Sequence, residues 1–477
     1  MGIGNKYDVI VVGAGIGGLV CGAYLAKSGL KILIIEQNDK AGGCCVSFKR
    51  KGFRFDAGAH ILGSCNTHGV LFNILKKLGV EQKFARIDPV ERFFFGDDEY
   101  IVPAELDEYI AYLQRVFPHE KANIDPFFAE LVRISRNIKT SYAKYADLTY
   151  EDFLNKYFKD AKLKSVLSAQ SGYLGITPKR CSAVAMCAMM ASYLKDGAYY
   201  PIGGGSSLSD KLADRVKFFG GSLKFNTKAM KFIVDNNRIT GITACDSKKN
   251  THKFYGSAIV SNIDATYTLF NMMPSYLISD TVRNNINESE LSPALSMIFL
   301  GLKLDRKLIE KKNGWYYPDY DINKNLDDFV YISSPSQYDE SAAPCGATAV
   351  EAFQICNFSK ISGGVEGKKY KEETEKKLLN RVMTIIPEIK DNVVVKDSAT
   401  AGTIKKYTSN KNGVGYGWAL TPGQFARNVA ISDSLKKILY LVGHWTNPGC
   451  GILTVAISGY QISEKILHGS KNKISKG

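Results

Sequence analysis

The chain has 477 residues, of which 45% are hydrophobic and 23% are charged, a composition typical of a globular protein with two or three domains. Its net charge is +15, but the basic residues are scattered and form no compact block with interleaved aromatic residues. This argues against a nucleic-acid-binding protein and leaves contact with an anionic membrane surface open.

The ten cysteines form no CxxC pair, which predicts a reduced, intracellular protein without a metal site. The first predicted strand begins near Tyr7, so we expect no signal peptide before it. The longest apolar stretch, Ala183 to Leu194, is too short to span a bilayer. We therefore expect a cytoplasmic protein, with association at a membrane surface left open.

The segment from Tyr7 to Glu36 predicts strand, glycine turn, helix and second strand, followed by an acid. Gly13 allows a tight turn, Gly15 lets a pyrophosphate approach the backbone, and Gly18 lets the helix pack against the strand. Glu36 is placed to accept hydrogen bonds from ribose hydroxyls. GxGxxG alone is a weak signal, but the complete order predicts a dinucleotide site rather than an ordinary strand–helix–strand unit.

Segments of two kinds alternate along the chain. Residues 79–199 predict a hairpin around Gly96 and Asp97, helices over 105–116 and 125–138, and a continuous apolar helical region over 166–194. We predict an α/β fold in which a Rossmann-like domain carries an inserted α+β substrate domain with an antiparallel sheet. The expected nucleotide-binding segments are 1–78, 200–264 and 406–477, and the expected substrate-domain segments are 79–199 and 265–405.

A second glycine-rich unit lies near the end of the chain. Leu439 to Val442 predicts a buried strand, and an irregular loop from Gly443 to Gly451 leads into a helix that starts near Ile452. Small residues on one face of this helix would let it lie close to a flat group: Ala456, Ser458 and Gly459. Its N-terminus could face an electron-rich ring edge. The alternative is a generic strand–loop–helix that closes a sheet.

With these motifs, the chain resembles the phytoene desaturase, carotenoid isomerase and retinol saturase family of FAD-dependent oxidoreductases, within the amine oxidase-like flavoprotein superfamily. The resemblance rests on VIVVGAGIGGLV with Glu36, AGGCC, YPIGGGSSLSDKLA, SAIVSNID and LYLVGHWTNPGCGILTVAISG. It implies a GR2-type flavoprotein that binds FAD. The residues implied in FAD binding are Gly13, Gly15, Ile16, Gly17, Gly18, Glu36, Gln37, Gly42, Gly43, Cys44, Met230, Gly443, Gly451 and Ile452.

Several residues keep two interpretations. Met230 could contact adenine through its backbone or pack in the core, and the Gly203 to Gly205 turn could touch a ligand or simply reverse the chain. His60 and His444 are candidates near the flavin ring, although either could merely pack. Cys44 and Cys45 replace an arginine found in many members of the family. They could form a redox couple, but adjacent cysteines rarely bridge, which favours small packed residues.

No catalytic triad or paired-carboxylate signature stands out, which fits chemistry carried by a cofactor. We expect a flavin enzyme that transfers hydride at flavin N5 and acts on carbon–carbon bonds of a long apolar isoprenoid or polyene. Desaturation, saturation and isomerisation remain open. One alternative is an amine or porphyrinogen oxidase, with Trp445 and Tyr416 as the available aromatic residues. Another is a non-catalytic prenyl-binding protein on the same fold.

Overall fold

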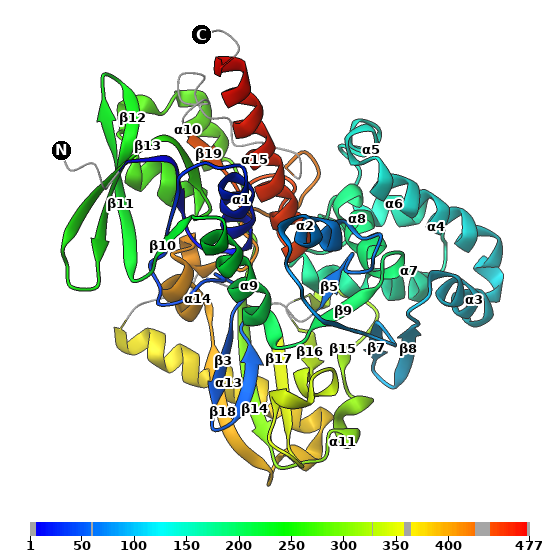
Figure 1. Ribbon diagram of the computed structural model, residues 1–477. Helices are drawn as coiled ribbons and strands as arrows, with labels where there is room; N and C mark the ends of the chain where they lie inside the picture. Colours follow the sequence, from blue (N-terminus) through cyan, green and yellow to red (C-terminus); the bar gives the residue numbers. More distant parts are fainter. Residues whose placement is uncertain (1–5, 59–60, 327, 357–363, 425–438, 475–477) are drawn as a thin grey trace.

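The computed structural model describes residues 6–58, 61–326, 328–356, 364–424 and 439–474 (Figure 1). Among these residues, two seven-stranded sheets organise the fold, with a two-stranded and a three-stranded sheet beside them. No helix in the described ranges has both the length and the apolar character needed to cross a bilayer. His60 lies outside the described residues, so its predicted place near a cofactor stays a prediction.

The first sheet is the predicted Rossmann-like sheet. Its strand order is β10-β2-β1-β13-β12-β11, and β19 pairs with the end of β13. The strands β10, β2, β1, β13 and β19 run parallel, whereas β12 and β11 form an antiparallel extension. The bounds are β1 (Lys6–Val12), β2 (Ile32–Ile35), β10 (Ser222–Lys224), β11 (Thr227–Asp235), β12 (Arg238–Asp246), β13 (Thr251–Ser261) and β19 (Leu439–Leu441).

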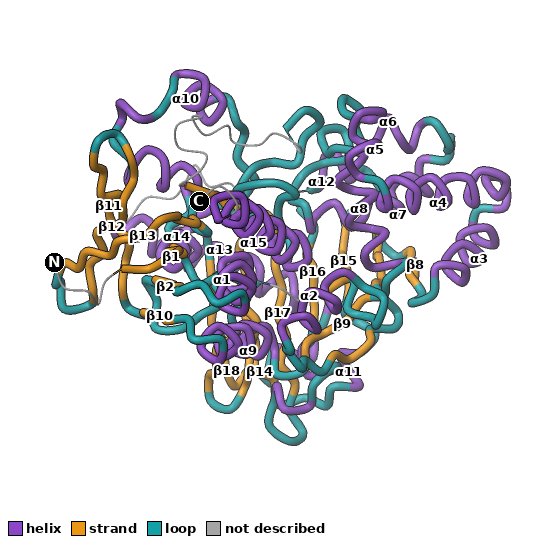
Figure 2. Tube along the Cα trace, turned by 45° about the horizontal axis from the view of Figure 1, so that its top comes forward, coloured by secondary structure: helices purple, strands orange, loops and turns teal. Residues whose placement is uncertain are grey.

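Helices cover both faces of this sheet. One face packs against α1 (Ile16–Lys27), α2 (Val70–Leu78), α9 (Gly204–Phe218) and α15 (Ile452–Ile474), with α15 lying beside α1 in both views (Figures 1 and 2). All residues of α1 except Lys27 are buried, because its sequence is apolar or small on every side. The other face packs against the π-helical turn Tyr267–Met272 and α10 (Asp280–Asn287).

The second sheet has the order β18-β14-β17-β16-β15-β7-β8 and is antiparallel except where β15 meets β7. Its bounds are β7 (Glu91–Phe95), β8 (Asp98–Val102), β14 (Ala294–Leu302), β15 (Gly314–Tyr317), β16 (Val330–Ser333), β17 (Thr348–Cys356) and β18 (Val393–Ala399). The antiparallel sheet and the hairpin at Gly96 are thus as predicted. The first sheet draws strands from three regions of the chain and the second from two, while the predicted domain boundaries stay a prediction.

Alternating side chains of the second sheet enter two cores. Met297 and Phe299 belong to an aromatic cluster shared with the helices between β8 and β9, whereas Ile298 and Leu300 pack against α13 (Gly364–Ile385). The helices on the aromatic side are α3 (Leu106–Val116), α4 (Lys121–Arg136), α5 (Ile138–Tyr145), α6 (Tyr150–Asn155), α7 (Ala161–Ser168) and α8 (Ala183–Leu194). The smaller elements are β3 (Ser47–Arg50), β4 (Phe53–Asp56), β5 (Leu62–Gly63), β6 (Phe84–Arg86), β9 (Ala198–Pro201), α11 (Lys307–Glu310), α12 (Ile322–Asn325) and α14 (Ala401–Thr408).

The continuous helical region expected over 166–194 is wrong. The helix α7 ends at Ser168, a 3-10 turn covers Ala169–Tyr173, and α8 begins only at Ala183. Gly175 has a φ of +68°, a left-handed conformation that an α-helix cannot contain. The apolar run nevertheless stays buried, because its turns pack against the aromatic cluster.

Candidate functional site

The first glycine turn lies at the carboxyl end of β1, between β2 and β13. Gly13 has a φ of +94°, which favours glycine, and its N–H donates to the carbonyl of Ile35 at 2.8 Å. A Cβ built on Gly18 would lie 2.3 Å from the carbonyl oxygen of Gly13, so α1 could not pack this close to the turn with any side chain there. Two of the three spaced glycines are therefore required by the turn itself.

The N-terminus of α1 has no capping side chain. In α6, α7, α8 and α10 a side chain at the N-cap accepts a backbone N–H. The N-cap of α1 is Gly15 and its first turn carries no acidic residue, as is also the case for α2 and α9. Backbone N–H groups at such an end carry a partial positive charge and need an acceptor. The donor set therefore fits an anionic group such as a pyrophosphate. Ile16, Gly17 and Gly18 form this first turn.

Glu36 follows β2 and lies beside the turn. One carboxylate oxygen accepts the N–H of Ala14 at 2.8 Å, and the other accepts the backbone and side-chain N–H groups of Asn38, both at 2.9 Å. Burial raises the pKa of Glu36, and these hydrogen bonds oppose that rise. The amide of Gln37 donates to the carbonyl of Tyr407 at 2.8 Å, and the same carbonyl accepts the Asn38 amide at 2.9 Å.

The paired glycines Gly42 and Gly43 lie against the first turn. The N–H of Gly42 donates to the carbonyl of Ala14 at 2.8 Å, and a Cβ on Gly43 would lie 3.4 Å from the Cα of Gly15. Two segments that the sequence separates by nearly 30 residues thus form one surface. This surface consists of backbone, as close approach to a phosphate requires.

The two adjacent cysteines that follow have different environments. Cys44 is exposed and Cys45 is buried, and both are free thiols. Burial raises the pKa of Cys45 to about 12, so its thiol stays protonated at neutral pH. Packing therefore accounts for Cys45, whereas the exposed Cys44 is a free thiol.

The last glycine loop reaches the same place from the other end of the chain. Gly443 follows β19 with a φ of +94°, and a Cβ on Gly17 would lie 3.2 Å from the N–H nitrogen of Gly443. Gly451 has a φ of +104° and directly precedes Ile452, the first residue of α15. The structure therefore brings the predicted first and last glycine motifs together.

At Gly459, the small face of α15 meets α1 rather than a flat group. A Cβ on Gly459 would lie 2.3 Å from the carbonyl oxygen of Gly17, so this face crosses α1 at close range. The hydroxyl of Ser458 accepts the N–H of Gly443 at 3.3 Å, and Ala456 is buried in the same core. Helix crossing therefore accounts for the glycine at position 459, and the hydrogen bond from Gly443 accounts for the serine at position 458.

Asn262 is the residue of this site that motif reasoning missed. It directly follows β13, its N–H donates to the carbonyl of Val12 at 2.8 Å, and its carboxamide lies among the glycines of both loops. A signal was present in the sequence, since a polar residue that ends a buried parallel strand lies at the edge where such folds bind ligands. The pattern SAIVSNID supports the family resemblance and a buried strand over 258–261, but neither assigns a role to Asn262.

Met230 lies in β11 where the register with β12 shifts between Ala229 and Lys231. Its side chain is 41% exposed, so the core-packing interpretation is wrong. The same strand begins beside Glu36, because Thr227 donates its N–H to the Glu36 carbonyl at 2.8 Å. This leaves backbone contact with a bound nucleotide as the interpretation that the geometry permits.

His444 lies at the other end of the site, directly after Gly443. Its Nε2 lies 3.4 Å from the amide nitrogen of Asn410, and burial lowers its pKa to about 4. The imidazole is therefore neutral at pH 7. It is a hydrogen-bonding group rather than a cation.

The two aromatic residues considered for an amine oxidase do not face one another. Trp445 is buried on the far face of the first sheet, edge-to-face with Trp418 at 4.9 Å between ring centroids. Tyr416 packs against the aromatic cluster of the second sheet and donates to the carbonyl of Gly172 at 3.3 Å.

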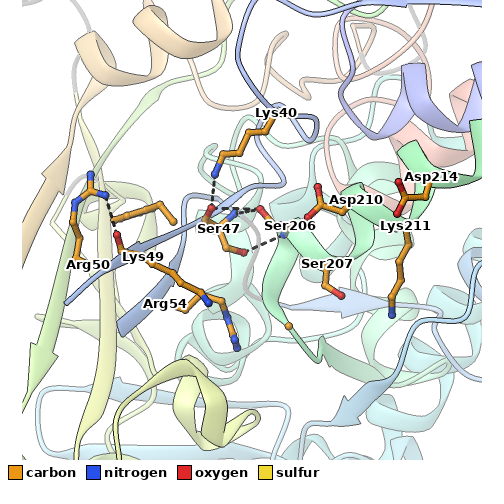
Figure 3. Close-up of a pocket in the computed structure, with 12 residues that line it drawn as sticks. Lys40, Ser47, Lys49, Arg50, Arg54, Ser206, Ser207, Asp210, Lys211 and Asp214 are labelled. Carbon is orange, nitrogen blue, oxygen red and sulfur yellow. Dashed lines mark hydrogen bonds between the residues drawn. The ribbon is translucent and has the colours of Figure 1, made fainter. Parts of the chain in front are cut away.

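An open groove of about 670 Å³ lies outside this site, between β3 and the start of α9 (Figure 3). Its cations are largely engaged within the protein, since Lys40 donates to the carbonyl of Ser47 at 2.6 Å and Arg54 pairs with Asp339 at 2.6 Å. The Ser206 N–H at the start of α9 already donates to the Ser47 hydroxyl at 3.0 Å. None of the predicted cofactor residues lines this groove.

The fold and the site together define a Rossmann-like dinucleotide-binding protein of the kind found among oxidoreductases. Residues 11–78 match the NAD(P)-binding Rossmann-like domain family. The chain is similar to the all-trans-retinol 13,14-reductase of Danio rerio, with 25% identity over 86% of this chain and 77% of that protein. It is also 25% identical to prolycopene isomerase 1 of an Oncidium hybrid cultivar, over 97% of this chain and 84% of that protein.

The relatives also include a desaturase: the 4,4'-diapophytoene desaturase of a Methylomonas species is 23% identical, over 97% of this chain and 95% of that one. An oxidoreductase of known structure from Methanosarcina mazei superposes with a TM-score of 0.70 at 17% identity, over 96% of this chain and all of that one. The predicted resemblance to the phytoene desaturase, carotenoid isomerase and retinol saturase group is confirmed, and the protein is an oxidoreductase-type enzyme.

Proposed function

We propose that the protein is an FAD-dependent enzyme that desaturates, saturates or isomerises carbon–carbon bonds of a long apolar polyene or isoprenoid. The observation that carries this proposal is the convergence of three glycine-rich segments on the uncapped N-terminus of α1, beside a buried acid. The named relatives, which are a retinol reductase, a prolycopene isomerase and a diapophytoene desaturase, support the substrate class.

In this proposal, the backbone around Gly13, Gly15 and Gly43 would hold the pyrophosphate, because only backbone at that surface lets a phosphate approach closely. Glu36 would accept a hydrogen bond from a ribose through Oε2, which accepts only the Ala14 N–H within the described residues, whereas Oε1 already accepts two hydrogen bonds from Asn38. The backbone at Met230 would contact the adenine. Gly443, Gly451 and Ile452 would lie at the ring end, where bound flavin would supply hydride transfer at its N5 atom.

Two residues near the ring end favour an apolar substrate. Cys450, in the last glycine loop, and Tyr416 both pack against the aromatic cluster of the second sheet. This cluster contains a dense group of rings: Phe93, Phe95, Trp315, Tyr317, Phe329, Tyr331 and Phe353. A polyene needs such surroundings, since burying it in an apolar region gains the hydrophobic contribution and costs no unpaired polar group.

The chain itself contributes a neutral polar group at this end. His444 is uncharged at pH 7 and follows the loop that would face the ring. It can donate or accept one hydrogen bond without placing a charge next to an apolar substrate. We propose this orienting role in place of acid–base catalysis, for which its lowered pKa suits it poorly.

The test is purification of the full chain, an absorbance scan, and mass spectrometry of extracted small molecules. We expect flavin absorption, FAD in the extract, and retention of an added polyene. A protein that stays colourless when FAD is supplied would contradict the proposal and favour a prenyl-binding protein. Rapid bleaching of the flavin by amines would instead favour an amine oxidase.

The direction of the reaction needs a second experiment. Turnover with oxidised enzyme, accompanied by reoxidation with oxygen or a quinone, would indicate desaturation. A strict need for prior reduction with no net use of reductant would indicate isomerisation, and stoichiometric use of reductant would indicate saturation. Co-sedimentation with anionic lipid vesicles would test the membrane contact that the net charge of +15 would favour.

A further inference from the structure

Asn262 occupies the centre of the site rather than its edge. It ends β13, which lies directly beside β1, so its side chain emerges at the same sheet edge as the first glycine turn. Its amide nitrogen lies 3.4 Å from the carbonyl oxygen of Gly13, to which it donates. Asn262 thus contacts the turn that the sequence places about 250 residues earlier.

Four glycines surround this one carboxamide. A Cβ on Gly15 would lie 2.7 Å from the Asn262 amide nitrogen. A Cβ on Gly17 or on Gly443 would lie 2.8 Å or 2.7 Å from its amide oxygen, and one on Gly18 would lie 3.1 Å from its Cβ. Side chains on any of these glycines would displace Asn262, so several glycines of both motifs make room for this residue as well as for a ligand.

The first and last loops also meet directly, since a Cβ on Gly17 would lie 3.2 Å from the Gly443 nitrogen. The N–H of Gly443 donates to Ser458 of α15, not to the first turn. The carboxamide is the polar group that touches the Gly13 turn on one side and Gly443 on the other. Its rigid planar shape fixes the separation of the two loops, because an amide has only two side-chain torsions to adjust.

We propose that Asn262 is the positioning residue of the cofactor site, which sets the first glycine turn and the last glycine loop relative to each other. This rests on the proposed function, since the first loop would hold the pyrophosphate and the last the flavin ring. Asn262 would therefore govern both the affinity for FAD and the orientation of its ring. Neither Gly13 nor Gly443 can do this alone, since each touches only one end of the site.

The experiment compares FAD binding by the full chain and by N262A, N262D and the control N73A. Asn73 is a matched control, because its amide donates to the carbonyl of Gly69 at 2.9 Å, away from the site. We expect N262A to bind FAD about tenfold more weakly than wild type, because it loses one hydrogen bond and the packing of the carboxamide. We expect N73A to bind FAD like wild type. We also expect N262A to change the visible circular dichroism of bound flavin, which reports ring orientation and which a general loss of stability would not alter.

The variant N262D distinguishes a positioning role of Asn262 from a role in folding alone. It is isosteric with asparagine but loses the donor and adds a negative charge beside the phosphates at neutral pH. Its affinity for FAD should therefore be lower than that of wild type at neutral pH, and part of the difference should be recovered as the pH falls from 6 toward 4, where an aspartate carboxyl group begins to bind a proton. If wild type binds FAD while N262A and N262D match it in affinity, dichroism and pH dependence, the positioning role is excluded and the proposed function stands. If wild type takes up no FAD, the positioning role and the proposed function are both contradicted.

Discussion

Gly17 and Gly459 meet where α1 crosses α15, and a Cβ on Gly459 would lie 2.3 Å from the Gly17 carbonyl oxygen. No real Cβ approaches a backbone atom so closely, and the two helices are held by the sheet beneath them. The first and last helices of the Rossmann-like unit are therefore in backbone contact. This crossing aligns the loops at their N-terminal ends, where the candidate site lies.

We predict that G459A lowers the free energy of unfolding by about 1–3 kcal/mol, because the added methyl group must force the two helices apart. The same helix contains its own control. A Cβ on Gly469 would meet nothing within 4 Å, so G469A should raise stability by about 0.5–1 kcal/mol through helix propensity alone. Urea unfolding monitored by circular dichroism measures both changes. Equal effects of the two substitutions would contradict the close crossing.

A second prediction concerns Gly15. Its φ of −73° tolerates a side chain, so G15A should fold, but the methyl group would lie 2.7 Å from the Asn262 amide nitrogen and on the surface proposed for the pyrophosphate. We expect the affinity for FAD to fall by at least about tenfold, or 1.4 kcal/mol. FAD titration followed by fluorescence quenching measures it.

The control for this substitution is G402A in α14, where a Cβ would meet only the Thr400 hydroxyl at 3.8 Å. This variant should bind FAD as wild type does. A G15A protein that purifies with a full complement of FAD would show that the phosphates are held elsewhere.

The sequence predicted the parts of the site that depend on local pattern. The strand–turn–helix around Gly13 and the loop before Ile452 are recognisable because the chain supplies their turn residues and apolar runs within short windows. The antiparallel sheet was predictable for the same reason. Each of these elements can be interpreted without knowledge of what packs against it.

What depends on long-range packing could not be predicted. The small face of α15 suggests close contact, but only the fold shows that the contact is Gly17 on α1 rather than a ring. Asn262 looks like an ordinary residue after a strand until β13 is placed beside β1. The apolar run over 166–194 gives no sign of its break, because burial inside the aromatic cluster and left-handed Gly175 decide it.

A third prediction concerns pH. Burial lowers the pKa of His444 from 6.5 to about 4, so below pH 6.5 the unfolded chain binds a proton that the folded protein does not take up. Stability from this residue is complete above pH 6.5 and is lost as the pH falls toward 4. Urea unfolding at pH 7 and pH 5 isolates this contribution as a difference between variants: relative to H444Q, wild type should lose on the order of 2 kcal/mol of stability between the two pH values.

The matched control is H68Q, which removes an exposed imidazole. It should keep the pH dependence of wild type. Identical slopes for wild type and H444Q would mean that the imidazole is hydrated in solution, which would remove the argument for a neutral group at the ring end.

The last prediction concerns Glu91, a carboxyl group enclosed by the aromatic cluster of the second sheet. It is 4% exposed, and one of its oxygens accepts the hydroxyl of Tyr173 at 2.6 Å. Burial raises its pKa to about 8, against smaller opposing contributions from Tyr173 and Trp315. The folded protein therefore holds a proton there at pH 7 that the unfolded chain, with an ordinary carboxyl group, has released.

Because the folded state binds the extra proton, stability from this group is complete at about pH 4 and is lost progressively as the pH rises toward 8. E91Q keeps an acceptor for Tyr173 but cannot ionise, so it should become more stable than wild type as the pH rises from 5 to 8, by on the order of several kcal/mol. E91A should destabilise at every pH, since it leaves the buried Tyr173 hydroxyl without its acceptor. The control is E108Q, at an exposed position on α3. If the stability difference between E91Q and wild type does not change with pH, Glu91 is ionised within the aromatic cluster. The cluster would then be too polar to receive a polyene.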